Sequence, residues 1–537
     1  MRRFVCLALL VGSFGCSSGE IGRSDVKRQF SMPNQCGACH PTQFREWQGS
    51  VMHYAAVSPV FRAFELTMRK LSTGLFAANG DAPNFCIGCH SPTGDLNGEL
   101  PDFIDQANAF DALPSLSPVS QEGLSCDFCH TVQGPALTAS PLGDGIANCS
   151  LLFSPNETKV GPIDDPQAST FHTASYSSYL QSSEFCGACH DVRIPVPDLV
   201  TGEPFQRLEN LFTEWQEGPY NSTDNPFGKV VQCQDCHMSL YPMTEPGVFP
   251  TMKVAVGAGL PERQHTIHAF TASSIPFIDD PRIPDISTEA VDDFGYPMGQ
   301  QQRREQMLRA AVQMSADHTP TTLSAGAATI PIRLTLTNVG AGHRVPAGFS
   351  QEREVWVELT VQDDVGVIYQ SGALHDQAHP ETGELIPDGR LDDEDLEHQH
   401  FDVDLETLDT HVSAGPDVDQ RPNGINLGLV NFQNRFVRIG DDGSWESVLN
   451  PLYADHMDNS HSLDMLVPTE VHYDVPVPSR GISGDVRIFA RLRYRAFPPE
   501  FLRLVAQREP ELVSEEIVDL NAIVDMAEAS TTISVSP

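Results

Sequence analysis

The sequence predicts a chain of two unlike parts. The first, over residues 32–270, is α plus irregular and contains short helices; an all-β, sandwich-like domain follows over 322–537. Two observations predict this division: Cys-x-x-Cys-His motifs occur only in the first part, and alternation of apolar and polar residues begins only after about residue 322. Residues 271–321 are expected to form a linker with one helix at 301–317.

The N-terminal residues predict export from the cytoplasm. Arg2 and Arg3 precede a short apolar run, as in a signal segment over residues 1–16. Cys16 stands in a Ser/Gly-rich stretch and is the lipidation candidate, with 17–31 as a tether. We therefore expect a lipid-anchored protein of the periplasm, outer membrane or cell surface. The alternative is cleavage nearby, which would give a soluble periplasmic protein.

Five Cys-x-x-Cys-His motifs carry the main chemical signal of the first part. A cysteine pair of this spacing can be a redox pair, half a zinc site or a heme attachment site, and a histidine directly after every pair favours heme. Two thioether bonds hold the porphyrin, and the histidine is the proximal iron ligand. The motifs therefore predict five covalently bound c-type hemes at Cys36–Cys39–His40, Cys86–Cys89–His90, Cys126–Cys129–His130, Cys186–Cys189–His190 and Cys233–Cys236–His237.

The motifs are spaced irregularly along the chain. Consecutive motif histidines are separated by 50, 40, 60 and 47 residues, so no strict repeat is expected. Few apolar periodicities in this part are long enough for a conventional core, and we expect the porphyrins to supply much of the buried apolar surface. Helices should be short, with one candidate at 41–56. Cys149 lies outside the motifs and is expected to be a buried free thiol.

The second axial ligands of the irons are expected to be histidines. Outside the motifs, residues 32–270 contain only four histidines, and all four are candidates: His53, His172, His265 and His268. Four distal ligands do not serve five hemes, so either one iron has an open position or the C-terminal part supplies a ligand. His343, in a Gly-rich turn, is the best candidate there. Weaker candidates are His318, Met52, Met238 and Met252. Other C-terminal histidines, such as His456, are expected at the surface.

Alternating apolar residues predict strands in the C-terminal part. Ile330, Ile332, Leu334 and Leu336 alternate with polar residues, as do Val355, Val357, Leu359 and Val361, and then Val486, Ile488, Ala490, Leu492 and Tyr494. Several such strands separated by turn residues predict a β-sandwich. The third segment carries Arg487, Arg491, Arg493 and Arg495 on its other face. We expect cross-strand pairs with acids there; the alternative is contact with heme propionates or a partner.

The net charge of −39 limits the partners of the protein. Such a surface repels nucleic acid and anionic lipid and favours cationic redox partners, although solubility alone would also explain it. No stretch after the N-terminal segment is apolar enough for a membrane helix, so membrane contact is expected only through the lipid.

The residues around the motifs resemble a known group of cytochromes. Cys36-x-x-Cys39-His40-x3-Phe44-x2-Trp47-x2-Ser50-x2-His53 is similar to the first heme segment of multiheme cytochromes related to the nitrifiers' tetraheme cytochrome c and hydroxylamine oxidoreductase. The segments 123–134 and 265–270 resemble later parts of that group. Residues 338–348 followed by 353–366 resemble a β-rich extension of some members. The resemblance implies closely stacked, mostly bis-histidine hemes that pass electrons.

Three functions fit these observations. The first is an electron-transfer cytochrome. The second is a heme enzyme that acts on a small nitrogen or sulfur compound at one open heme. The resemblance counts against it, because the sequence has no lysine-bearing attachment motif and no clear cross-linking tyrosine. The third is a subunit of a cytochrome filament or surface complex, in which the β domain serves assembly.

Overall fold

The structure is a computed structural model of the 537-residue chain. It describes residues 30–67, 85–99, 115–137, 142–154, 158–167, 171–240, 245–257, 259–277, 280–292, 294–373, 430–440, 442–448, 451–514 and 520–536, with short pieces at 377–378, 385–386, 401–403, 410–412 and 517. The predicted export signal and the lipidation candidate Cys16 lie outside the described residues.

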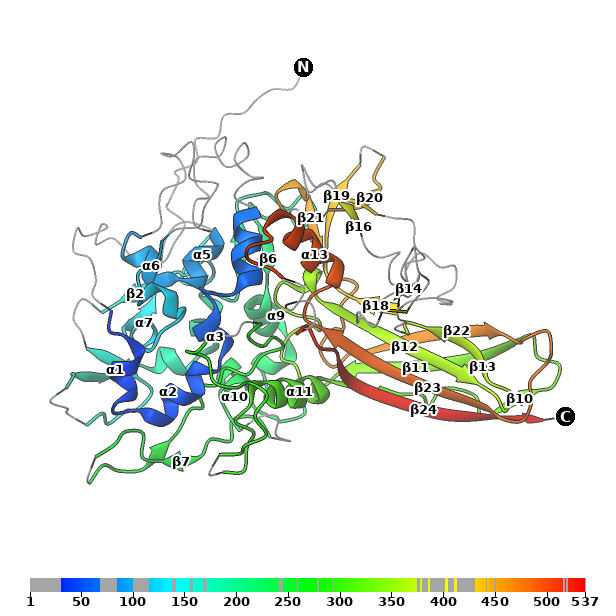
Figure 1. Ribbon diagram of the computed structural model, residues 1–537, viewed down its shortest axis with the longest axis horizontal. Coiled ribbons are helices and arrows are strands. Elements are labelled where there is room, and N and C mark those ends of the chain that lie inside the picture. The colour runs from blue at the N-terminus through cyan, green and yellow to red at the C-terminus, as the bar shows by residue number, and fades with distance from the viewer. Residues whose placement is uncertain are drawn as a thin grey trace, which may run out of the picture.

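The first part consists of short helices and small two-stranded sheets (Figure 1). Its helices are α1 (Pro33–Gly37), α2 (Pro41–Gln48), α3 (Val51–Tyr54), α5 (Phe85–His90), α6 (Pro92–Leu96), η2 (Ser120–Glu122), α7 (Cys126–Cys129), η3 (Ser178–Gln181), α8 (Ser183–Gly187), α9 (Leu211–Glu217), η4 (Pro219–Asn221) and α10 (Cys233–His237). Its strand pairs are β1–β2 (Val132–Pro135, Leu151–Phe153), β3–β4 (Lys159–Gly161, Ala174–Tyr176), β5–β6 (Val192–Ile194, Gln206–Glu209) and β7–β8 (Thr251–Met252, Arg263–Gln264). The expectation of short helices and irregular chain is met.

The predicted helix at 41–56 is broken into α2 and α3. Gly49 ends the first helix, and Ser50 begins the second as an N-cap whose side chain accepts a hydrogen bond from the backbone N–H of His53. A serine in this position satisfies an amide that the first helical turn leaves without a partner. The break redirects the chain, so His53 does not lie on a continuous helix beyond His40.

The C-terminal part is built from β-sheets, as the alternation predicts. One sheet has the order β10 (Thr322–Ser324), β24 (Val524–Ser536), β23 (Val486–Arg495), β12 (Glu354–Gln362) and β13 (Val367–Ser371), with β18 (Val430–Phe432) also paired to β12. A second has the order β22 (Pro468–Pro476), β11 (Thr329–Asn338) and β9 (Val312–Ser315). Smaller sheets pair β14 (Gln377–Ala378) with β15 (Leu385–Ile386), β16 (Phe401–Val403) with β17 (Thr410–Val412), and β19 (Arg435–Ile439) with β20 (Trp445–Val448) and β21 (His456–Asp458).

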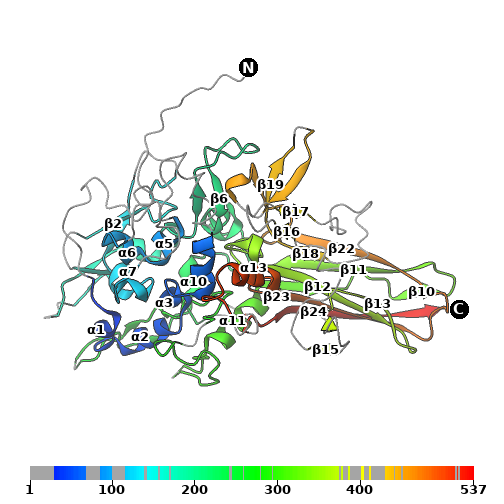
Figure 2. The ribbon, with the colours of Figure 1, turned by 45° about the horizontal axis from the view of Figure 1, so that its top comes forward.

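The alternating residues point into a shared apolar core. All of the predicted inward residues of β11, β12 and β23 are at most 2% exposed. One hydrophobic cluster contains these residues together with Val471 and Tyr473 of β22 and Ile533 of β24, so both large sheets contribute to it. Figure 2 shows the long strands extending together away from the helical part. The sandwich arrangement itself stays a prediction.

The outer face of β23 carries the arginine pairs that the sequence predicts. Arg491 donates to Glu358 at 2.6 Å, and Arg493 donates to the same carboxylate at 2.6 Å and to Asp525 at 2.9 Å. The side chain of Arg495 likewise donates to Glu354 at 2.6 Å. The arginines therefore pair across strands with acids.

The linker joins the two parts more closely than predicted. The helix expected at 301–317 is α11 (Gln300–Ala311), which lies between the two parts (Figure 1), and the chain turns extended at Val312 to form β9. Val312 is β-branched, 2% exposed and paired with β11, which favours a strand over further helix. The β region thus begins about ten residues earlier than expected, at β9 rather than at 322. A further helix, α13 (Pro499–Arg508), follows β23, and η5 (Ser350–Glu352) and η8 (Pro451–Tyr453) are short helices of the same part. In the first part, residues 59–67 are also helical.

A buried carboxyl at this junction makes stability depend on pH. Glu352 is 3% exposed, and burial raises its pKa to about 8. Because the folded chain binds this proton more tightly than the unfolded chain, folding loses free energy as pH rises from about 4.5 to about 8. We expect E352Q to remove this dependence and to stabilise the protein above pH 8 by on the order of 2 kcal/mol. Calorimetric unfolding at pH 5 and pH 9 tests this, and an equal effect of E352Q at both pH values would contradict it.

Candidate heme-binding centres

Each attachment motif is wound into a single helical turn. The backbone N–H of the motif histidine donates to the carbonyl of the first cysteine, at 2.8 Å for His40, 3.0 Å for His130 and 2.9 Å for His190. The turn brings both thiols and the imidazole together, as attachment of one porphyrin requires. All ten motif cysteines are partly exposed residues, and their chemistry and spacing fit covalent heme.

The motif histidines are oriented through one ring nitrogen. The Nδ1 atoms lie within hydrogen-bonding distance of backbone carbonyls in four motifs: His40 to Val254 at 2.6 Å, His90 to Ala55 at 3.2 Å, His130 to Val160 at 2.8 Å and His237 to Thr271 at 2.6 Å. A carbonyl can only accept, so Nδ1 must carry the proton and Nε2 is left as the electron-pair donor. This is the arrangement in which a second contact fixes the tautomer of an iron ligand.

Three distal candidates face a motif histidine at the spacing of an iron site. The ring centroids are 6.4 Å apart for His40 and His172, 6.2 Å for His130 and His268, and 6.4 Å for His237 and His343. A metal about 2 Å from one nitrogen of each imidazole separates the ring centroids by about 6 Å. The three pairs could therefore each hold one heme iron between them.

The three distal histidines repeat the orientation of the proximal ones. Their Nδ1 atoms face the carbonyls of neighbouring residues, at 3.1 Å for His172, 2.6 Å for His268 and 2.9 Å for His343. Burial lowers the pKa of His268 and of His343 to about 4. The neutral imidazole that binds iron is therefore the form present at neutral pH.

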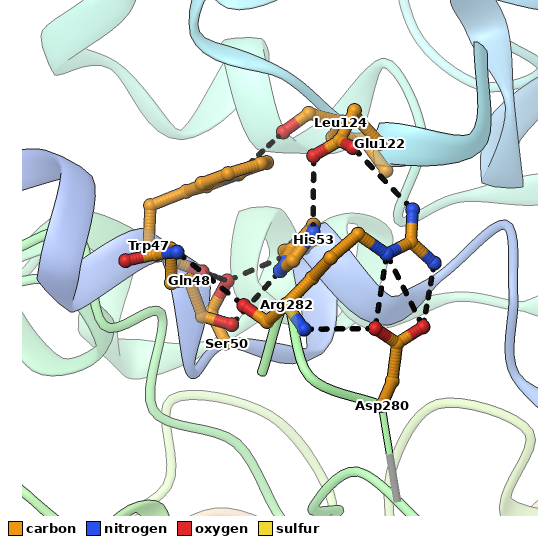
Figure 3. A network of polar contacts seen from close by, with 8 residues as sticks. All are labelled: Trp47, Gln48, Ser50, His53, Glu122, Leu124, Asp280 and Arg282. Atoms are coloured by element: carbon orange, nitrogen blue, oxygen red, sulfur yellow. Dashed lines mark hydrogen bonds and ion pairs between the residues drawn. The ribbon is translucent and has the colours of Figure 1, made fainter. Parts of the chain in front are cut away.

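His53 is held in a polar network instead. Its Nδ1 lies 2.8 Å from the carbonyl of Gln48, and its buried Nε2 lies 3.1 Å from Glu122, without the geometry of a hydrogen bond. Figure 3 shows Glu122 between His53 and Arg282, with Trp47 alongside. Both ring nitrogens of His53 thus face protein oxygens, and its ring packs 4.2 Å from that of Trp47. The structure does not bring this candidate to a motif histidine.

His265 is likewise held by a carboxylate. Its Nε2 lies 2.8 Å from Glu46, and the side chain is 1% exposed. The ring is 6.2 Å from that of His268, so ring spacing alone does not identify a ligand pair. Because its Nε2 faces Glu46, the structure supports His268 rather than His265 as the ligand opposite His130.

The second and fourth motifs have different surroundings. Among the described residues, no histidine outside the motifs is paired with His90 or His190. The ring of Phe61 stacks on that of His90 at 3.7 Å and 6°. His190 faces a carboxylate: its Nδ1 lies 3.6 Å from Glu209, where the other four motifs use a carbonyl. Burial would lower the pKa of His190, but Glu209 outweighs burial and raises it.

The carboxylate is expected to tune the heme of the fourth motif. A carboxylate beside the proximal imidazole makes it a stronger donor and favours ferric iron. We expect E209Q to raise the reduction potential of one heme by about 59 mV, which corresponds to tenfold in the equilibrium constant for one electron. An optical redox titration measures this change. E203Q is the control, because Glu203 pairs with Arg207 in the same hairpin; equal potentials in E209Q and wild type would contradict the role of Glu209.

Contacts between motifs show that their order in space differs from their order in sequence. The thiol of Cys126 lies close enough to that of Cys36 to shift its pKa, as the thiol of Cys189 does for Cys89 and that of Cys233 for Cys186. These contacts join motif 1 to motif 3, motif 2 to motif 4 and motif 4 to motif 5. One apolar cluster around Phe128 and Ala188 includes cysteines of motifs 2, 3 and 4. The motifs therefore form the line 1–3–4–5, with motif 2 beside motif 4.

Buried guanidinium groups give an independent test of whether the residues fit heme. Arg303 and Arg304 of α11 are 4% and 1% exposed. The Nε atom of Arg303 and the Nε and Nη1 atoms of Arg304 have no hydrogen-bond partner within the described part of the chain. A buried cationic donor without an acceptor is costly, and a heme propionate is an acceptor of the required charge. Arg303, which interacts with Glu46 beside His268, fits such an acceptor. Arg304 instead donates to the carbonyl of Ala522 and lies over the ring of Tyr494 in the β part.

Two further expectations need correction. Cys149 is buried but disulfide-bonded, so it is not the free thiol that its isolation in the sequence suggests. His456 is not a surface group, because its Nδ1 lies 2.8 Å from Asp198 and its side chain is 14% exposed. This contact links β21 to the first part of the chain. The partner of His456 lies 258 residues away in sequence, so no local pattern could predict this contact.

Sequence reasoning missed the three glutamates of the site. Glu46 contacts His265 and also accepts from the backbone N–H of His268 at 2.9 Å. Glu209 faces His190, and Glu214 accepts from the backbone N–H of Arg344 at 2.9 Å, next to His343. A signal was present for two of them, because Glu46 and Glu214 occur in the same short pattern, Phe-x-Glu-Trp-Gln.

Comparison with known proteins agrees with this assignment. The family described as cytochrome c554 and c-prime matches residues 35–131, which span the first three motifs. A penta-heme cytochrome c552 from Thermochromatium tepidum has a similar structure, with a TM-score of 0.50 over 94% of this chain and 99% of that chain, at 17% identity. A search of curated proteins found no match. With the five motifs, these matches support a multiheme c-type cytochrome with covalently bound heme c; the relation to hydroxylamine oxidoreductase stays a prediction.

Two kinds of feature are absent from the described residues. Within the described ranges, no helix has the length and apolar character needed to cross a membrane. In the same ranges, no group of three or more His, Cys, Asp or Glu side chains is placed to hold a metal ion.

Proposed function

We propose that the protein is a five-heme electron-transfer cytochrome of the cell envelope, in which at least three irons are held by two histidines. The observation that carries this proposal is the set of three histidine pairs at 6.2 to 6.4 Å, each formed by a motif histidine and a distal candidate whose Nδ1 atoms both face backbone carbonyls and leave Nε2 for iron. An iron with two imidazole ligands has no site for substrate and exchanges electrons. The family match and the penta-heme structure support the same class of protein.

The order of the motifs supports a relay. When heme is bound, its iron accepts and donates single electrons. The chain contributes the spacing, ligands and charges that set each potential. Electrons would enter at one end of the line of motifs 1, 3, 4 and 5 and leave at the other, with the heme of motif 2 exchanging electrons through motif 4.

A second function has a specific observation in its favour. His90 and His190 have no histidine partner among the described residues, so one of these hemes could have an open iron position. A small nitrogen or sulfur compound would react there. The carboxylate of Glu209 beside His190 would increase electron donation to such an iron.

An optical redox titration with heme quantification separates the two functions. The carrier predicts five hemes per chain, reversible one-electron reduction of each, and no steady-state turnover of nitrite, hydroxylamine or sulfite. Fewer than five hemes would contradict both functions. Five hemes with sustained turnover of one of these compounds, inhibited by cyanide, would favour the enzyme.

The location and partners are part of the same proposal. We propose export, lipid anchoring through Cys16, and exchange of electrons with a cationic redox protein; the net charge of −39 supports such a partner. Labelling with radioactive fatty acid in the wild type and in C16A tests the anchor. Assembly into filaments is an alternative that light scattering of the purified protein would reveal.

A further inference from the structure

A five-residue pattern occurs twice beside the attachment motifs. Phe-x-Glu-Trp-Gln stands at 44–48 and at 212–216, and each copy follows a Cys-Gly-Ala-Cys-His motif. The first copy begins four residues after His40 and the second begins 22 residues after His190. The different spacing hides the correspondence in the sequence.

The backbone removes this difference in spacing. The N–H of Phe44 donates to the carbonyl of His40 at 3.1 Å, and the N–H of Phe212 donates to the carbonyl of His190 at 3.0 Å. In the second copy, the residues between His190 and Phe212 form the hairpin β5–β6, which projects from the chain between these two hydrogen-bonded residues. The motif and the helix after it therefore meet in the same way in both copies.

The phenylalanine packs on the glycine of the motif in both copies. A Cβ atom added to Gly37 would lie 2.6 Å from the ring of Phe44, and one added to Gly187 would lie 2.4 Å from that of Phe212. Both distances are too short for a real Cβ atom. Glycine is therefore required at each position by the same close approach.

The tryptophan ties each copy to a second motif. Nε1 of Trp47 donates to the carbonyl of Leu124 at 2.9 Å, and Nε1 of Trp215 donates to that of Val231 at 2.7 Å. Both acceptors lie two residues before the first cysteine of a motif, Cys126 and Cys233 respectively. The thiols of Cys36 and Cys126 contact each other, as do those of Cys186 and Cys233.

The glutamate reaches the distal histidine of that second motif. Glu46 accepts from the backbone N–H of His268, which faces His130. Glu214 accepts from the backbone N–H of Arg344, directly after His343, which faces His237. Both bonds are 2.9 Å long. In each copy, the glutamate at the third position of the pattern therefore binds the backbone of the segment that carries the distal histidine.

We propose that motifs 1 and 3 and motifs 4 and 5 are two copies of one two-heme unit, in which Glu46 and Glu214 are positioning residues for the distal ligands. This inference rests on the proposed heme loading. The two hemes of one unit would have the same relative position and orientation as the two hemes of the other. The line of motifs 1, 3, 4 and 5 then consists of one unit followed by the other.

The distal segments need such an anchor because they are not helical. His268 lies in the irregular stretch after β8, and His343 lies in the turn that follows β11. A loop ligand has no neighbouring helical turn to fix it, so backbone hydrogen bonds to a buried carboxylate replace that support. Glu214 is 7% exposed, and the side chain of Glu46 is 14% exposed.

Alanine and glutamine substitutions test the role of the glutamates. In E46A and in E214A we expect a high-spin ferric signal in low-temperature EPR equivalent to up to one heme per chain, with added imidazole restoring the low-spin signal. E214Q keeps an acceptor oxygen and should remain low-spin. E217A is the matched control on α9, because Glu217 is exposed and ends the same helix.

The outcomes separate this inference from the proposed function. Heme is quantified in every variant by pyridine hemochrome. Five hemes in the wild type with unchanged spin states in both E46A and E214A would overturn the positioning role and leave the heme relay intact. Fewer than five hemes in the wild type would contradict the proposed function itself. A response in only one of the two variants would overturn the equivalence of the two units.

Discussion

Replacing both cysteines of the fourth motif in C186A/C189A is expected to break the heme relay. Motif 4 contacts motif 2 and motif 5 through its thiols and shares an apolar cluster with motif 3. Loss of its heme would reduce the heme count from five to four and separate motifs 1 and 3 from motif 5. We expect electron exchange between these two ends to fall below detection. Freeze-quench EPR after rapid reduction follows the individual hemes over time.

The matched control removes the heme that lies beside the line. C86A/C89A also reduces the heme count by one, but motif 2 lies beside the line, next to motifs 3 and 4, and does not stand between motif 1 and motif 5. Exchange between motif 1 and motif 5 should therefore continue. Mass spectrometry of each variant establishes that only one heme is missing. Equal loss of exchange in both double variants would contradict the proposed order of the motifs.

Substitution of the distal histidines should divide them into two groups. H172A, H268A and H343A each remove the Nε2 atom that faces a motif histidine, so each should convert one heme from low-spin to high-spin. An exposed sixth position should then bind cyanide or imidazole. The signal is expected to amount to about one heme per chain, because each pair serves one iron.

The second group of histidines supplies the controls. His53 and His265 are buried, but their Nε2 atoms face Glu122 and Glu46. H53A and H265A should therefore leave the spin state of every heme as in the wild type, although the loss of buried hydrogen bonds should lower stability by about 1–3 kcal/mol each. A high-spin heme in H53A would show that this residue is a ligand.

Much of the β part could be predicted because every second residue along its strands is buried and apolar. Alternation gave the positions of β11, β12 and β23, and the arginines of β23 pair with acids as cross-strand geometry requires. The helix expected at 301–317 was too long. Its propensity extends beyond Ala311, but pairing with β11 makes Val312 extended, and such tertiary contacts override local preference.

The site could be predicted only where the chemistry is local. Each attachment motif contains its own thiols and its own candidate proximal histidine, so the prediction of five hemes needs no distant residue. The partner of each iron depends on distant loops: His343 faces His237 from more than 100 residues away, and His53 is turned aside by the break at Gly49. The repeat of Phe-x-Glu-Trp-Gln was hidden because the β5–β6 hairpin interrupts its second copy.

The most direct test of the account is low-temperature EPR of the oxidised protein, with heme quantified by pyridine hemochrome on the same sample. The account predicts five hemes per chain, of which at least three give low-spin signals that are lost one at a time in H172A, H268A and H343A. Fewer than three low-spin hemes in the wild type, or low-spin signals that survive all three substitutions, would contradict it.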